Sequence, residues 1–154
     1  MRCSTSRLFS PGLISSILIG MALVAGSGVA RAAQNDTLRP LHIGQHVFRV
    51  EVAATPQQRQ QGLMGRTRLP VNGGMLFVFE QAGQHCFWMR NTPLPLSIAF
   101  IDATGRIVDL ADMQPFSDTQ HCPATEVRYA LEVPQGGFLQ RGIKPGAQLD
   151  GLPK

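Results

Sequence analysis

The sequence predicts a single mainly β domain, built as an antiparallel sandwich, a jelly-roll-like fold or a partly closed barrel, with one short helix at about residues 56–61. Short apolar runs separated by turn residues recur through most of the chain, and only one segment carries clear helix signals. No repeat or low-complexity tract divides residues 33–154, whose length suits one hydrophobic core.

The apolar runs indicate where strands form. Residues 47–53 alternate apolar and polar side chains, which is typical of a strand with one buried face. Other runs are apolar throughout, which favours strands covered on both faces. We expect strands near 41–43, 47–53, 75–79, 87–89, 96–101, 106–110, 127–133 and 147–149. Two prolines make residues 91–95 a loop, and residues 138–141 are expected to form one helical turn.

The helix prediction rests on its ends. Thr55 can cap the first turn, Pro56 suits the first helical position, and Gln58 stands where a capping box needs its partner. Gly62 can end the helix in a left-handed conformation. The helix is polar, so we expect it at the surface.

The N-terminal segment predicts export. Arg2 and Arg7 precede an uncharged, largely apolar run over residues 8–30, and an Ala-Arg-Ala site ends at Ala32. This is the pattern of a cleaved secretory signal peptide. An uncleaved membrane anchor is the alternative. We expect a signal peptide at 1–32, a loose lead-in at 33–40, one β-rich domain at 41–150 and a tail at 151–154, with the mature protein periplasmic or secreted.

Signal cleavage changes the charge balance. The chain has 14 lysines and arginines against 10 acidic residues. Residues 1–32 contain three of the basic residues and no acidic one, which leaves 11 against 10, a net charge of +1. A mature domain with so little net charge is not expected to bind nucleic acid. Membrane contact is expected only through the signal segment, if that segment stays uncleaved.

Two cysteines, Cys86 and Cys122, follow the signal segment. In an oxidising compartment such a pair usually forms a disulfide, which is the interpretation we favour. A histidine precedes each cysteine, so the alternative is a zinc or copper site built from His85, Cys86, His121 and Cys122. Adjacent residues of a strand point to opposite faces, which argues against that site, and we expect no cofactor.

The stretch from Phe87 to Thr92 is the richest candidate for binding. Trp88 could stack on a ligand, while Arg90, Asn91 and Thr92 could make polar contacts. The structural interpretation, which we favour, buries Trp88 in the core and gives Asn91 and Thr92 to the loop backbone. Arg66 could likewise bind an anion, or pair with Glu51 or Asp112.

The chain resembles a known family in several motifs that occur in the same order. These are Gly62-Leu63-Met64-x-Arg66, Gly74-Met75-Leu76-Phe77-x-Phe79, Phe87-Trp88-Met89-Arg90-Asn91-Thr92, Ile98-Ala99-Phe100-Ile101-Asp102, Ala130-Leu131-Glu132-Val133 and Gly142-Ile143-Lys144-Pro145-Gly146. Over about residues 41–150 it is similar to the family called domain of unknown function 192. The resemblance implies a compact β fold with one short helix, many exported members and no established activity. The family often has Asp where this chain has Ser97, so a mechanism that needs that carboxylate is not expected here.

Two function classes follow. The first is a non-catalytic binding or accessory domain that uses a shallow polar and aromatic site to hold a small molecule, a glycan or a protein. The second is a thiol- or metal-dependent protein or enzyme built on the His-Cys pairs. The sequence has no Gly-x-Ser-x-Gly, phosphate-loop or His-Glu-x-x-His motif, so the first class is favoured.

Overall fold

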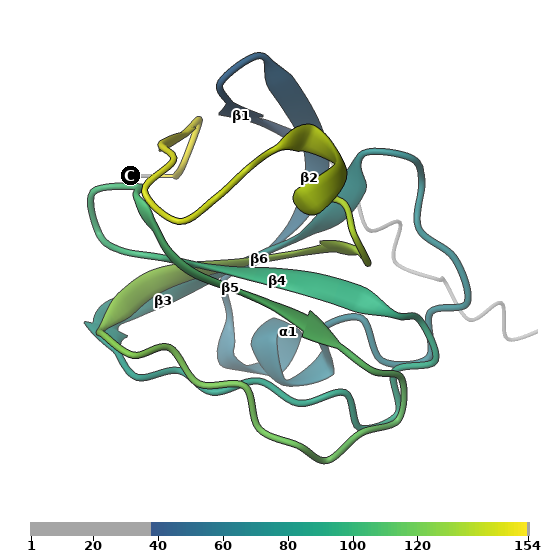
Figure 1. The fold of residues 1–154 in the computed structure, drawn as a ribbon. Helices are drawn as coiled ribbons and strands as arrows, with labels where there is room; N and C mark the ends of the chain where they lie inside the picture. Colours follow the sequence, from purple (N-terminus) through teal and green to yellow (C-terminus); the bar gives the residue numbers. More distant parts are fainter. Residues whose placement is uncertain (1–37, 154) are drawn as a thin grey trace, which may run out of the picture. The chain divides into compact units, whose positions relative to one another are not determined.

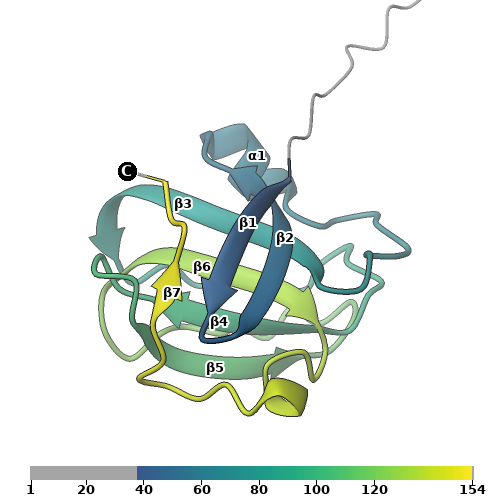
Figure 2. The same cartoon turned by 90° about the horizontal axis from the view of Figure 1, so that it is seen from above.

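The computed structural model describes residues 38–153, and the predicted signal segment lies outside them. The described chain forms one mixed sheet in the order β5-β4-β6-β3-β2-β1-β7. The strands are β1 (Arg39–Ile43), β2 (His46–Ala53), β3 (Gly73–Gly83), β4 (Leu96–Ile101), β5 (Ile107–Met113), β6 (Val127–Pro134) and β7 (Leu149–Asp150). Figure 2 shows β1, β2 and β7 crossing over the other strands, so the sheet curves into a half-barrel. The expectation of a mainly β, partly closed barrel is confirmed.

The helix α1 (Pro56–Gln61) forms at the predicted residues. The hydroxyl of Thr55 accepts a hydrogen bond from the backbone N–H of Gln58 at 3.2 Å, and the Gln58 side chain accepts one from the backbone N–H of Thr55 at 3.0 Å. This reciprocal pair is the predicted capping box. The single helical turn predicted at residues 138–141 forms as a turn of 3-10 helix, η1 (Leu139–Arg141).

One strand pairing departs from an all-antiparallel sheet. β2 and β3 pair in parallel, from Arg49 opposite Gly73 to Ala53 opposite Phe77. Parallel neighbours need a crossover connection, and α1 with the loop after it supplies one. The local pattern of each strand is the same for either direction, because side chains alternate in both cases.

The sheet separates two hydrophobic cores. In Figure 1, β1 lies above the central strands, while α1 and two long loops lie below them. The upper core contains Phe48, Leu76 and Leu131, and the core on the side of the loops, the loop-side core, contains Phe77 and Ala130. β3 and β6 therefore contribute side chains to both cores. β6 lies between β4 and β3 and is buried on both faces, as its apolar run predicts.

Residues 87–89 were expected to form a strand, and this prediction is wrong. Phe87 makes a single bridge to His121, and the N–H of Met89 donates to the carbonyl of Ser117 at 2.9 Å. The segment pairs with a second loop below the sheet instead of joining the sheet itself. No helix within residues 38–153 has the length and apolar character needed to cross a membrane.

The tight contact between β3 and β6 at Gly74 gives a test of this packing. A Cβ atom there would lie 2.3 Å from the backbone oxygen of Glu132. We expect Gly74→Ala to lower the free energy of unfolding by about 2 kcal/mol or more, because two backbones would have to separate. Gly83→Ala on the same strand is the control, since its nearest atom is a His85 side-chain nitrogen at 3.4 Å. Urea denaturation should show a change below about 0.5 kcal/mol for the control, and equal losses in the two variants would contradict the packing.

Candidate functional site

Two loops, residues 84–95 and 114–122, are fastened to each other below the sheet, and we call them the loop pair. A disulfide joins Cys86 to Cys122. Beside it, the backbone N–H groups of Phe87 and His121 donate to each other's carbonyl oxygens at 2.9 and 2.8 Å. Covalent and backbone bonds therefore fix the loops at the same place.

The loop pair presents an exposed tryptophan. Trp88 is 43% exposed, so the favoured prediction that it fills the core is wrong, because its loop does not join the sheet. The guanidinium carbon of Arg90 lies 5.0 Å from the Trp88 ring centroid, and Arg90 Nε donates to a carboxylate oxygen of Asp118 at 2.7 Å. Both charged side chains are largely exposed, so their pairing adds little to stability. The arrangement instead orients a ring, a cation and an anion toward solvent.

A second exposed ring lies on the other loop. Phe116 is 66% exposed and has a φ of 58°, a conformation that bulky residues rarely adopt. Its N–H donates to the carbonyl of Thr92 at 3.1 Å, which ties it to the first loop. Asn91 also has a positive φ, 57°. Within residues 38–153, Trp88 and Phe116 are the exposed large aromatic residues, and both belong to the loop pair.

We call the group formed by Trp88, Arg90, Asn91, Phe116 and Asp118 the loop patch. Thr92 was predicted as a binding residue, but it is buried and its hydroxyl donates to the carbonyl of Arg90 at 3.4 Å. Thr92 thus supports the backbone of the loop patch and is not part of its surface. Neither Phe116 nor Asp118 was predicted from the sequence, because only the pairing of the loops brings Phe116 to Thr92 and Asp118 to Arg90.

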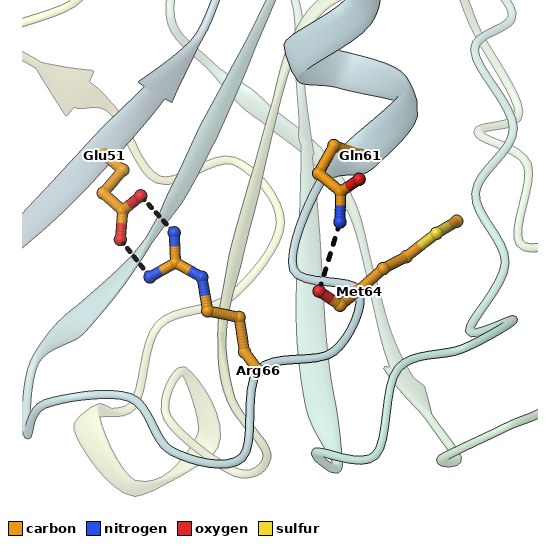
Figure 3. A network of polar contacts seen from close by, with 4 residues as sticks. All are labelled: Glu51, Gln61, Met64 and Arg66. Atoms are coloured by element: carbon orange, nitrogen blue, oxygen red, sulfur yellow. Dashed lines mark hydrogen bonds and ion pairs between the residues drawn. The ribbon is translucent and has the colours of Figure 1, made fainter. Parts of the chain in front are cut away.

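Arg66 lies near the loop patch, but its charge is already engaged. Its Nη1 and Nη2 atoms donate to the two carboxylate oxygens of Glu51 at 2.7 and 2.6 Å, as Figure 3 shows. Of the roles predicted for Arg66, the pairing with Glu51 is the one found. Asp112 accepts a hydrogen bond from Ser97 instead. The N–H of Gly65 donates to the carbonyl of Asn91 at 2.9 Å, so the Arg66 loop buttresses the loop patch.

The alternative metal site is not assembled in the described chain. The sulfur atoms of Cys86 and Cys122 are bonded to each other, and the His85 ring stacks on Phe79 at 3.6 Å between centroids. Residues 38–153 contain no group of three or more His, Cys, Asp or Glu side chains placed to hold a metal ion. With its sulfur in a disulfide, Cys86 also lacks the thiolate that a nucleophile needs.

Glu132, a buried acid that was not among the predicted site residues, lies on the face of the sheet that the loop pair covers. Glu132 is only 4% exposed and stands on β6 directly opposite Met75 of β3 and Ile98 of β4. Both neighbours belong to the loop-side core. No hydrogen bond to its carboxyl group is found within the described residues, and burial raises the pKa of Glu132 to about 8. At neutral pH the group is therefore mostly a neutral carboxylic acid.

Glu132 and the Arg66–Glu51 pair share one row across the sheet. Glu51 pairs with Met75, and Met75 pairs with Glu132 on its other side, so the two glutamates flank a methionine on one face. Their environments differ, because Glu51 has a guanidinium partner and Glu132 has apolar neighbours. The sequence signal was a charged residue inside the apolar run 129–133, where a buried strand was predicted.

The raised pKa of Glu132 predicts a pH-dependent stability. The unfolded chain releases this proton near pH 4.5, while the folded chain keeps it until about pH 8. Between these values the unfolded state binds fewer protons, so this residue lowers stability by up to about 1.4 kcal/mol for each pH unit gained. We expect Glu132→Gln to flatten that slope and to be more stable than the wild type at pH 8.

Urea unfolding at several pH values between 4.5 and 8 measures this effect. Glu80→Gln is the matched control, because Glu80 is an exposed glutamate on β3 and its replacement should leave the slope unchanged. Parallel pH profiles for the wild type and Glu132→Gln would contradict a buried, protonated Glu132.

Comparison with known proteins places the chain among uncharacterised relatives. A protein of unknown function from Novosphingobium aromaticivorans has a similar structure, with 35% identity, a TM-score of 0.70, and coverage of 72% of this chain and 83% of that one. A Sinorhizobium meliloti protein provisionally described as a transcription regulator is 35% identical, with a TM-score of 0.69 and coverage of 73% and 90%. The comparison with curated proteins gave no match. The family model DUF192, described as "Uncharacterized ACR", matches residues 39–151, and the chain therefore belongs to this family.

Proposed function

We propose that this protein is an exported, non-catalytic binding domain that recognises a protein partner through the loop patch. The observation that carries the proposal is the position of its exposed rings. Trp88 and Phe116, the exposed large aromatic residues of the described chain, project from two loops that are fastened together. Large aromatic side chains are costly to leave in water, and their clustering at one place is typical of an interaction surface.

The chemistry of the loop patch favours a protein partner. Tryptophan and arginine are enriched among the residues that dominate binding energy in protein interfaces. Here Arg90 stacks on Trp88 and is held by Asp118, so ring and cation are presented together. A partner that covers this group would exclude water from the Arg90–Asp118 pair and strengthen it. A glycan or a small molecule is the competing ligand class.

The construction of the loops supports binding without large rearrangement. The disulfide, the Phe87–His121 bonds and the Phe116–Thr92 bond fix the patch before any partner arrives. A preorganised surface loses less conformational entropy on association. The unusual backbone conformation of Phe116 is maintained by the same bonds, and such outliers cluster at ligand-binding positions.

Export is supported by the N-terminal sequence and by the disulfide. Residues 1–32 have the charge, apolar run and small-residue exit of a signal peptide. Both cysteines of the disulfide are exposed, and such bonds persist in oxidising compartments. The proposed location is therefore the periplasm or the exterior of the cell.

Site-specific photo-crosslinking in the producing cell tests the partner. A benzoylphenylalanine residue would replace Trp88, Phe116 or, as control, Val47, an exposed residue of β2 outside the loop patch. We expect discrete protein adducts from the first two positions and none from the control. Adding Arg90→Ala to the Phe116 variant should reduce its adduct, because the cation over Trp88 is lost. The crosslinked protein should begin at Ala33.

Two outcomes would contradict the proposal. Adducts of equal yield from all three positions would indicate non-specific contact, and no protein adduct at either patch position would exclude a stable protein partner. In the second case, a change of Trp88 fluorescence with glycans or small molecules would identify the other ligand class. Trp88 is the single tryptophan of the chain, so that signal is unambiguous.

A further inference from the structure

A pocket that includes no loop-patch residue lies between two segments far apart in the sequence. Its volume is about 250 Å³, and it is lined by residues 69–72 of the loop before β3 and by residues 133–141 from the end of β6 to η1. Phe48 of β2 contributes a buried ring. We call it the Arg141 pocket, because Arg141 is the one charged residue among those that line it.

The guanidinium of Arg141 is positioned but not neutralised. Its Nη1 donates to the carbonyl of Gly137 at 2.6 Å, and its Nη2 donates to the side-chain oxygen of Asn72. Its guanidinium carbon lies 5.1 Å from the centroid of the Phe48 ring. All of these partners are uncharged, and within residues 38–153 Arg141 forms no ion pair. A guanidinium carries five N–H donors, so three have no protein acceptor in the described chain.

The walls around this cation are of two kinds. The side chains of Asn72, Gln135 and Gln140 offer amide groups. The remaining side chains are apolar and belong to Phe48, Leu69, Pro70, Val71, Val133 and Pro134. A ligand that fits both parts needs a planar acceptor group for the guanidinium and an apolar portion for the wall.

We propose that the Arg141 pocket binds a small monocarboxylate that carries a short apolar chain. A carboxylate matches the planar donor fork of arginine, and its single charge matches the single cation. A phosphate dianion would leave one charge uncompensated against apolar walls. The volume lies below the range of pockets for drug-sized ligands, which restricts the apolar chain to a few carbon atoms.

The probe for this site is pentanoate, with pentanamide as its neutral analogue and inorganic phosphate as a competing anion. Titrations of the purified protein would be followed by ¹H–¹⁵N NMR at the amides of Gly137, Gln140 and Arg141. We expect saturable shifts with a Kd of about millimolar, and binding of pentanamide and phosphate at least about tenfold weaker. Arg141→Gln should weaken pentanoate binding at least about tenfold. The affinity of Arg141→Lys for pentanoate should lie between those of the wild type and Arg141→Gln. Lys144→Gln, which removes a cation outside the pocket, should bind like the wild type.

Several results would overturn the proposal. Equal affinity for pentanamide and pentanoate would show that the negative charge of the ligand does not contribute to binding. Phosphate binding as tight as that of pentanoate, or tighter, would exclude a site specific for carboxylates. Unchanged binding by Arg141→Gln, or no saturable shift in the wild type, would exclude the pocket. Because Arg141 also holds the η1 turn, resonances of β4 and β6 would verify folding. If the glutamine variant does not fold, the lysine variant, which keeps the charge but not the fork, decides the question.

Discussion

The disulfide between Cys86 and Cys122 fixes the two loops that cover the loop-side core. The bonded cysteines are 36 residues apart. A crosslink that closes a loop of that size lowers the entropy of the unfolded chain, which stabilises the folded state by roughly 3–4 kcal/mol. The bond stands where the chain has left the sheet, beside a single backbone bridge. Without it, the two loops would be joined to each other by that bridge, by backbone bonds to residues 116 and 117 and by the exposed Arg90–Asp118 pair. Because disulfides persist only under oxidising conditions, the shape of the proposed binding surface depends on the redox state of the compartment that holds the protein.

The sheet that these loops cover accommodates an acid at a cost. Glu132 lies on β6, a largely buried strand, among apolar neighbours, and keeps its proton at neutral pH because a buried charge there would lack a partner. The other glutamate of the same row, Glu51, pairs with Arg66, and the loop of Arg66 is hydrogen-bonded to Asn91 through Gly65. The two glutamates of one row therefore have opposite environments, a guanidinium partner for Glu51 and apolar neighbours for Glu132. The Arg141 pocket uses a different set of elements, so the two proposed sites can fail independently.

Features set by neighbouring residues could be predicted from the sequence, and of the distant pairings only those with a chemical signal could be, such as the disulfide of the two cysteines. The capping box of Thr55 and Gln58 is local, and α1 forms at the predicted residues. Trp88, Arg90 and Asn91 were selected because they stand together in the chain. The parallel pairing of β2 with β3 leaves no mark on the alternation of either strand. Phe116 and Asp118 join the site only through loop pairing, and the Arg141 pocket forms where residues 69–72 meet residues 133–141.

Amide hydrogen exchange before and after reduction of the disulfide tests the central claim most directly. The amides of Phe87, Met89 and His121 report on the loop pair, and those of β6 report on the sheet. If the disulfide holds the loops in place, reduction should lower the protection factors of the loop amides more than those of the β6 amides, because the loops would open locally. Equal losses in loops and sheet, or loop amides as protected as before, would contradict the account.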